Sequence, residues 1–246
     1  MERRRDLEDV VYGVHAVREA LEAGDALRRL HVARECTRDP AVRTLLDKAR
    51  EQGVSIRIED RRFFDRFPYK AHQSVVAYGT PFDYATLEEV LAQRDGGPLL
   101  LVVLDHITDP HNAGAIIRTA ECAGAAAVVL PERRSAGVNG TVRKAAAGAT
   151  AHLPIARVVN VGAALRTLKK AGVWIAGADA RGTPLTQTDL KGDLALVVGA
   201  EGKGLSEVAR GQCDFLVQVP LLGKVGSLNA SVAAGIILYE AVRQRR

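Results

Sequence analysis

The chain has 246 residues, enough for one large or two small domains, and its 47% hydrophobic and 26% charged residues are typical of a globular protein. Its three cysteines form no Cys-x-x-Cys pair, which argues against disulfides and zinc and favours a reducing compartment. No apolar run reaches the roughly 18 residues that span a membrane. The first residues also lack the apolar segment of a secretory signal. We therefore expect a cytoplasmic protein.

The chain is basic, with a net charge of +5 and a pI near 9.3. Its arginines are clustered, at Arg3 to Arg5, Arg28 and Arg29, Arg61, Arg62 and Arg66, Arg133 and Arg134, and Arg243, Arg245 and Arg246. Such clusters are typical of nucleic-acid binding. A merely solvated surface gives the same pattern, so charge alone leaves both interpretations open.

The first block of predicted structure runs from about Val10 to Tyr78. Apolar periodicity and breaker residues predict, in chain order, a helix over 12–23, a strand over 30–33, a helix over 40–49, and strands over 54–58 and 74–78. The segment 80–98 contains Pro81, a short helix over 87–91 and the turn sequence Asp95-Gly-Gly-Pro. We therefore predict an N-terminal domain over 1–79, a linker over 80–98 and a C-terminal domain over 99–246.

The second block alternates strands and helices. It begins with a wholly apolar strand over 99–104, as expected in a buried parallel sheet. The elements predicted after it are a helix over 113–123, a strand over 128–130, helices over 141–147 and 160–170, strands over 173–176 and 194–198, a helix over 205–210, a strand over 215–219 and a helix over 229–243. This order predicts an α/β fold, with a parallel sheet covered by helices on both faces.

Three segments of this block carry polar residues where a strand runs into a turn before a helix. They read Asp109-Pro-His-Asn-Ala-Gly-Ala-Ile-Ile-Arg118, Val198-Gly-Ala-Glu-Gly-Lys-Gly-Leu205 and Val219-Pro-Leu-Leu-Gly-Lys-Val-Gly-Ser-Leu-Asn-Ala-Ser231. Such turns are common ligand sites, because the backbone N–H groups at a helix start lack partners within the helix. We expect the three segments to form one composite site.

Each polar residue also has a purely structural explanation. Asn112 is placed as a helix N-cap, and an exposed helical arginine such as Arg118 is usually just solvated. Glu201 is placed to compensate the dipole of the following helix. Ser227 and Asn229 are both good caps for the last helix. Periodicity alone therefore does not make this chain an enzyme.

Several other sites are disfavoured by spacing. The glycines at 199, 202 and 204 follow the order G-x-x-G-x-G, which is neither the dinucleotide fingerprint nor a phosphate-binding P-loop. His106 and His111 lie across a turn with no third ligand near them in sequence, so no metal site is predicted. No Ser-His-Asp order or nucleophile elbow is visible.

Together the three segments resemble the signature motifs of the SpoU, or TrmH-like, branch of the SPOUT RNA 2′-O-ribose methyltransferases. The first block resembles the N-terminal domain of the RlmB-type enzymes, at Val11-Tyr-Gly-Val-His-Ala-Val and His72-Gln-Ser-Val-Val-Ala. Those enzymes methylate a guanosine ribose of large-subunit (23S) ribosomal RNA. Ser74 and His106 depart from the pattern, because relatives usually carry glycine at both places.

The resemblance implies a small L30-like RNA-binding domain followed by a SPOUT domain with a trefoil knot. It implies S-adenosylmethionine (AdoMet) as cofactor, ribosomal RNA as partner and a homodimer, for which the last helix offers Val232, Ile236, Tyr239 and Val242. The residues implied to bind the cofactor are Gly199, Val219, Leu221, Gly223 and Leu228. The residues implied in catalysis are Arg118, Asn112, Glu201, Ser227 and Asn229.

The implied reaction is attack of a ribose 2′-oxygen on the AdoMet methyl group, without a metal. Because a guanidinium stays protonated in proteins, we expect Arg118 to bind the target phosphate and stabilise developing charge. Two alternatives keep the fold. The target could be transfer RNA or another ribosomal site, or the protein could be a non-catalytic RNA-binding or assembly factor. The retained polar residues argue against the second alternative, and a nicotinamide dehydrogenase lacks its fingerprint.

Overall fold

The computed structural model describes residues 10–22, 27–67, 72–79, 82–94 and 96–246. It divides into two compact units, chiefly residues 1–83 and 84–246. Among the described residues, no helix is both long and apolar enough to cross a bilayer.

The N-terminal unit contains a four-stranded sheet in the order β1-β4-β2-β3. Its strands are β1 (Val10–Tyr12), β2 (Leu27–Ala33), β3 (Ser55–Glu59) and β4 (Val75–Gly79). β4 runs antiparallel to β1 and β2, whereas β2 and β3 are parallel. Strand β1 was not predicted, because three residues are too few to show alternation and the predicted helix began at Tyr12.

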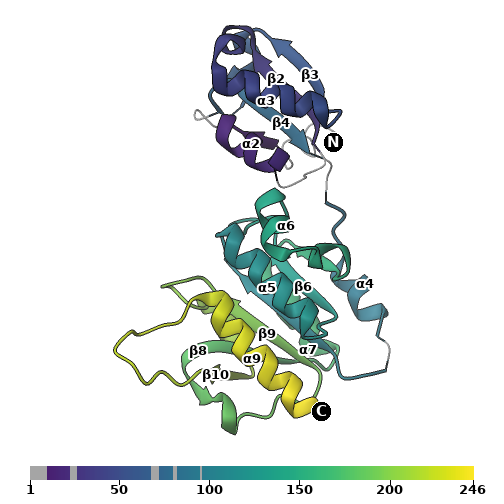
Figure 1. Ribbon diagram of the computed structural model, residues 1–246. Coiled ribbons are helices and arrows are strands. Elements are labelled where there is room, and N and C mark those ends of the chain that lie inside the picture. The colour runs from purple at the N-terminus through teal and green to yellow at the C-terminus, as the bar shows by residue number, and fades with distance from the viewer. Residues whose placement is uncertain (1–9, 23–26, 68–71, 80–81, 95) are drawn as a thin grey trace. The chain divides into compact units, whose positions relative to one another are not determined.

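Both faces of this sheet are covered. Helices α2 (Val14–Glu22) and α3 (Pro40–Glu51) lie on one face (Figure 1), where Leu21, Leu30 and Leu45 form its core. Asp39 caps α3, and Pro40 occupies the first helical turn. The opposite face carries the 3₁₀ helix η2 (Arg61–Arg66) and a second core around Phe64, whereas the 3₁₀ helix η1 (Arg34–Arg38) follows β2.

The predicted linker over 80–98 needs correction. In the structure the boundary between the units falls after Asp83, and α4 (Leu87–Ala92) is part of the C-terminal unit. Thr86 and Glu89 form a capping box at the start of α4, and Leu87 and Val90 are buried in the core of that unit. Two apolar side chains one turn apart were too weak a signal to show that the segment docks on the sheet.

The C-terminal unit is built on a six-stranded sheet in the order β10-β8-β9-β5-β6-β7. Every neighbouring pair is parallel. The strands are β5 (Leu100–Asp105), β6 (Ala127–Pro131), β7 (Ile155–Val158), β8 (Trp174–Pro184), β9 (Leu194–Gly199) and β10 (Phe215–Gln218). The predicted α/β class is confirmed, although the short strand β7 was not predicted. The strand order reverses between β5 and β9, the place where such sheets bind ligands.

Helices cover both faces of this sheet, as predicted. They are α5 (Pro110–Cys122), α6 (Gly140–Ala146), α7 (Val161–Lys170), α8 (Glu207–Gln212) and α9 (Ala230–Arg245), with short 3₁₀ turns η4 (Ala149–Ala151) and η5 (Leu185–Gln187). Helices α4, α7 and α8 share one core with alternate residues of the strands, such as Leu101 and Val103. Helices α5 and α9 pack against each other on the sheet's other face (Figure 1). The predicted N-cap Asn160 is confirmed.

Strand β8 continues well beyond its predicted end at residue 176. Its pairing with β10 jumps in register, because Leu216 pairs with Gly177 but the next residue, Val217, pairs with Thr183. The residues between them, 178–182, therefore bulge out of the ladder at the carboxyl end of the sheet.

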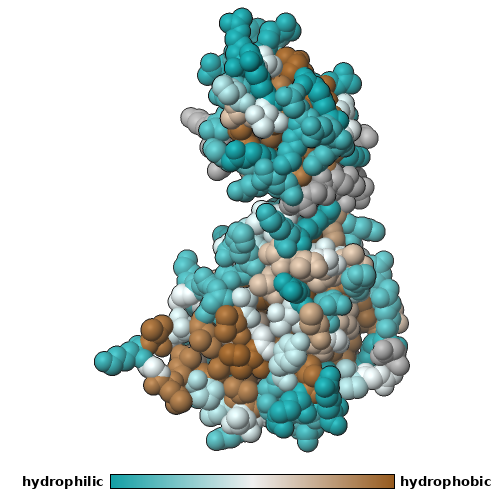
Figure 2. Space-filling model, viewed as in Figure 1, coloured by the Kyte–Doolittle hydropathy of each residue, from teal (hydrophilic) through white to brown (hydrophobic). Residues whose placement is uncertain are grey.

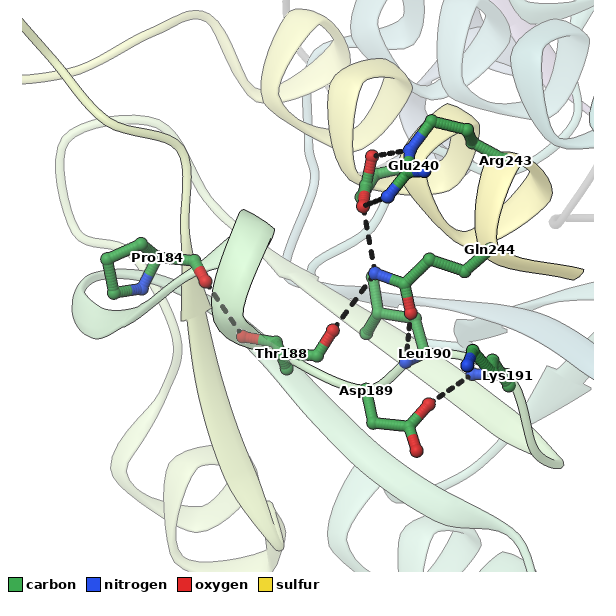
Figure 3. Close-up of polar contacts among 8 residues, drawn as sticks. All are labelled: Pro184, Thr188, Asp189, Leu190, Lys191, Glu240, Arg243 and Gln244. Carbon is green, nitrogen blue, oxygen red and sulfur yellow. Dashed lines mark hydrogen bonds and ion pairs between the residues drawn. The ribbon is translucent and has the colours of Figure 1, made fainter.

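The C-terminal end of α9 is held to the connection between β8 and β9 (Figure 3). Gln244 donates from Nε2 to the Thr188 carbonyl at 3.0 Å and accepts from the Leu190 N–H at 2.9 Å. Glu240 accepts from both Arg243 and Gln244. These bonds fix the position of α9, whose other end carries Asn229.

The two departures from the family pattern share one backbone property. Ser74 has φ of 55° and His106 has φ of 61°, in the left-handed region. An L residue is strained there, whereas glycine is not, so the backbone at both places suits the glycine that the family resemblance implies.

Candidate active site at the carboxyl edge of the sheet

The first two segments meet because their strands are neighbours. β5 and β9 pair in parallel, with Asp105 opposite Gly199, so both chains leave the sheet at the same edge. Asn112 lies in the first turn of α5, and Glu201 lies two residues after the end of β9. The third segment follows β10 and leads into α9, which packs against α5.

One carboxylate joins all three segments. Glu201 Oε1 accepts hydrogen bonds from the side-chain amides of Asn112, at 2.9 Å, and Asn229, at 2.5 Å. Asn229 Nδ2 also approaches Asn112 Oδ1 at 2.8 Å, and the Ala230 N–H approaches Glu201 at 3.4 Å. We call Asn112, Glu201 and Asn229 the polar cluster. A charged acceptor with several donors is a strong and directional arrangement.

The structural explanations of these residues are partly wrong and partly confirmed. Asp109, not Asn112, caps α5, since it accepts from the His111 N–H. Asn112 is only 6% exposed, and its side-chain amide donates to Glu201. A buried polar group needs such a hydrogen-bond partner. Asn229 does cap α9, because its Oδ1 accepts from the N–H groups of Ser231 and Val232. Glu201 meets the start of α9 rather than that of the next helix, α8.

A cavity of about 420 Å³ lies beside the polar cluster. Four of the residues predicted to bind the cofactor line it, namely Gly199, Val219, Leu221 and Leu228, whereas Gly223 does not. Of the predicted catalytic residues, Glu201 and Ser227 line it. The cavity volume is within the range of small-molecule sites, roughly 300–1,000 Å³.

Backbone atoms form one wall of this cavity. A Cβ on Gly199 would lie 2.2 Å from the carbonyl carbon of Gly204, so only glycine fits there. The Gly204 N–H closes the loop on the Ala200 carbonyl at 2.8 Å. Apolar side chains form other parts of the wall, and Asp179 and Glu201 contribute carboxylates. Apolar walls, backbone polar groups and acidic side chains suit AdoMet, which has an adenine, a ribose and a cationic sulfonium.

Three charged residues that lie outside the signature segments also line this cavity and were not predicted, namely Asp179, Arg181 and Arg210. Asp179 accepts from Arg210 Nη1 at 2.5 Å and Arg181 Nε at 3.2 Å. Burial opposes ionisation of Asp179, but hydrogen bonds from both arginines outweigh it and lower the pKa of the carboxyl group. For Asp179 and Arg181, the available signal was two charged residues at alternate positions shortly after the apolar strand 173–176, in a segment that was left unassigned.

The structure does not bring Arg118 into this cavity. It lies on α5 roughly 9 Å along the helix axis beyond Asn112. Its side chain is exposed and makes no hydrogen bond or ion pair with any other residue that the structure describes. Of the five predicted catalytic residues, the polar cluster and Ser227 therefore gather at the site, whereas Arg118 faces solvent.

His106 serves the site indirectly. Its Nδ1 lies 2.6 Å from Oδ1 of the fully buried Asp105, whose Oδ2 accepts from the Ser206 N–H at 2.6 Å. Asp105 thereby ties the end of β5 to the end of the glycine-rich loop. No group of acidic, histidine or cysteine side chains in the described part of the chain is arranged to hold a metal ion.

Comparison with known proteins agrees with this geometry. Residues 99–239 match the SpoU rRNA Methylase family, and residues 10–85 match the RNA 2′-O ribose methyltransferase substrate binding family. The chain is 45% identical to the 23S rRNA (guanosine-2′-O-)-methyltransferase RlmB of Pseudomonas syringae, covering 96% of this chain and 95% of that protein. It is 44% identical to a protein of Synechocystis named as an uncharacterized tRNA/rRNA methyltransferase, over 99% of this chain but only 65% of that protein.

Solved structures of the same class are also similar. The SpoU methyltransferase AviRb from Streptomyces viridochromogenes, in complex with AdoMet, superposes with a TM-score of 0.62 at 30% identity, over 96% of this chain and 90% of that one. Because the family match covers more than half of the residues and agrees with the assembled motifs, the chain belongs to the SpoU rRNA methylase family.

Proposed function

We propose that this protein transfers a methyl group from AdoMet to the ribose 2′-oxygen of a guanosine in large-subunit (23S) ribosomal RNA. The observation that carries the proposal is the Glu201 carboxylate, which joins the three signature segments beside a cavity suited to AdoMet. Identity of 45% to a protein named as a 23S rRNA guanosine methyltransferase, over nearly the full length of both chains, supports the target.

The protein's part in the reaction is alignment and charge stabilisation. AdoMet, when bound, supplies an electrophilic methyl group on its sulfonium. Gly199 and the loop after it hold the cofactor through backbone groups, while Leu228 and Val219 exclude water. The polar cluster fixes this loop relative to α5 and α9, and holding reactants in place lowers the barrier by several kcal/mol. Arg118 remains solvent-facing until RNA arrives, and binds the phosphate next to the target ribose.

The N-terminal unit supplies RNA binding. It matches a substrate-binding family, and its described surface carries Arg28, Arg29 and the arginines of η2. The L30-like character of this unit and the trefoil knot of the other, both implied by the family resemblance, remain part of the proposal. So does a cytoplasmic location, where ribosomal RNA is made in the bacteria that supply the relatives.

A homodimer completes the proposal. Apolar side chains gather on one side of the C-terminal unit, over α9 and the loop before it (Figure 2). Val232 is 49% exposed, Ile236 38% and Tyr239 52%, and the loop adds Leu222 and Val225. An exposed apolar patch of this kind marks an interaction surface. An Ile236→Glu variant would run as a monomer in size-exclusion chromatography with light scattering. If the variant dimerised as the wild type does, this face would not be the dimer interface.

Methyl transfer to defined RNAs tests the activity and the target together. The protein is incubated with methyl-labelled AdoMet and either unmodified 23S rRNA or bulk transfer RNA, and the position of label is read from resistance to alkaline cleavage. We expect label at one guanosine of the rRNA. Label on transfer RNA alone would refute the target but not the chemistry, and no label on either would refute the proposal.

A further inference from the structure

We propose that the N-terminal unit holds one unpaired nucleotide of the RNA in a cavity of about 390 Å³, formed by Arg28, Arg29, His31, Phe63, Arg66 and Tyr78. This inference rests on the proposed function, which makes RNA the substrate. Beyond that function, it identifies the residues that bind the RNA and the kind of nucleotide that fits between them.

A β-bulge turns two arginines toward this cavity. In β2, Leu27 pairs with Gly79 and Arg29 with Tyr78, so Arg28 is an extra residue in the strand. Leu27 and Leu30 are both buried in the core beneath α2 and α3. The two arginines between them are exposed and line the cavity with His31, on the other face of the sheet. In a regular strand successive side chains point to opposite faces, so one of the two arginines would point toward the helices.

Aromatic rings and a guanidinium form one stack at the cavity. The rings of His31 and Phe63 lie 4.5 Å apart and nearly parallel, at 10°. On Phe63, the Arg66 guanidinium lies 3.6 Å from the ring centroid. Unpaired bases are recognised by stacking on such rings and guanidinium planes. A base can therefore join this stack by lying on Arg66 or by taking its place on Phe63.

His31, one of the residues that line the cavity, has a buried polar atom that lacks a hydrogen-bond partner in the described part of the chain. It is only 5% exposed, and its Nδ1 bonds Glu59 Oε1 at 3.0 Å. Its Nε2 is buried without a hydrogen-bond partner among the described residues. Burial, with the charges of Arg29 and Arg66, lowers the pKa of His31 despite Glu59, so the ring is neutral at pH 7.

The tautomer of His31 follows from the hydrogen bond between its Nδ1 and Glu59. A carboxylate only accepts, so Nδ1 carries the proton and Nε2 is left as an acceptor. A buried acceptor without a partner is costly, which favours a ligand that brings an N–H or O–H. A nucleobase amino group and a ribose 2′-hydroxyl both do so. Three of the six lining residues that the structure describes are arginines and none is acidic. Their positive charge suits the RNA phosphates on either side of the bound nucleotide.

The test compares two double variants of the full-length protein with equal charge change. Arg28→Gln with Arg29→Gln alters the cavity, whereas Arg43→Gln with Arg50→Gln removes two exposed arginines from α3, on the other face of the sheet. Affinity for a stem-loop fragment of 23S rRNA is measured by fluorescence anisotropy as a function of salt. We expect the cavity variant to bind at least tenfold more weakly, with a log–log salt slope smaller by about 1.4–1.8. The α3 variant should bind like the wild type.

A Phe63→Leu variant tests stacking without a change of charge. We expect affinity for the stem-loop to fall about 5- to 150-fold, and affinity for a fully paired duplex to stay unchanged. An equal loss of RNA affinity in the two double variants would overturn the proposal. Unchanged RNA affinity in the Arg28/Arg29 and Phe63 variants would overturn it as well. AdoMet binding, measured by calorimetry, should be the same in all variants. Because RNA binding is measured without methyl transfer, failure of this site and failure of the proposed function give different results.

Discussion

The side-chain amide of Asn112 donates a hydrogen bond to the carboxylate of Glu201, 89 residues later in the chain. Asn229, from the third segment, donates to the same oxygen. The bonds hold the start of α5, the loop after β9 and the start of α9 in one geometry. The site therefore depends on a contact that no single motif contains.

Replacing Asn112 by alanine should lower turnover more than cofactor affinity. The loss of a hydrogen bond to a charged acceptor costs about 1.5–3 kcal/mol, which is roughly 10- to 150-fold in rate if the bond acts in the transition state. Steady-state methyl transfer and calorimetric AdoMet titration measure the two effects. Asn160→Ala, which removes the cap of α7 away from the site, is the control and should leave both unchanged. Abolished AdoMet binding with normal folding would contradict the assignment.

Gly199→Ala should weaken AdoMet binding by more than tenfold. The added Cβ would lie 2.2 Å from the Gly204 carbonyl carbon, so the loop that walls the cavity must move. Gly211→Ala on α8 is the matched control, because nothing lies within 4 Å of its Cβ. Calorimetry gives the affinities, and circular dichroism checks the fold. Wild-type affinity in the folded Gly199 variant would show that this loop does not hold the cofactor.

Arg118→Lys should lose most of the activity, about 10²-fold, with AdoMet affinity unchanged. Lysine keeps the charge but not the planar fork that fits a phosphate, and a preorganised donor of this kind is typically worth 10²–10³-fold. Arg166→Lys, on the exposed face of α7, should behave as wild type. Near-full activity in the Arg118 variant would exclude a requirement for the guanidinium.

Ser74→Gly should stabilise the N-terminal unit by up to about 1 kcal/mol, because it relieves a left-handed backbone at φ of 55°. Ser55→Gly, in β3 and exposed, should instead destabilise it by about 0.5–1 kcal/mol. Urea unfolding of the full chain, followed by far-ultraviolet circular dichroism, measures both. A destabilised Ser74 variant would mean that its backbone is not strained.

Local sequence chemistry predicted most of the fold. The apolar run of β5, the Asn160 cap and the proline at the start of α3 fix their elements without help from the rest of the chain. Strands β1 and β7 were not predicted because they are short and form only by pairing with neighbouring strands. The bulge at 178–182 is set by pairing with β10, which periodicity within β8 cannot reveal.

The site was predicted as one composite of three segments, but the contacts within it were not predicted. Each of Asn112, Glu201 and Asn229 could be explained as a cap or a dipole partner, and Asn229 does cap α9. Their convergence follows from the strand order, which brings β5 beside β9. Asp179 and Arg210 were missed for the same reason, since their ion pair joins β8 to α8.

A crystal structure of the full-length protein with S-adenosylhomocysteine, the demethylated product, tests the central claim most directly. We predict that the ligand lies in the cavity between the Gly199 loop and Leu228, with its sulfur turned toward the polar cluster. A ligand bound elsewhere, or one in this cavity whose sulfur is turned away from Glu201 and Asn229, would contradict the claim that the three segments form one methyl-transfer site.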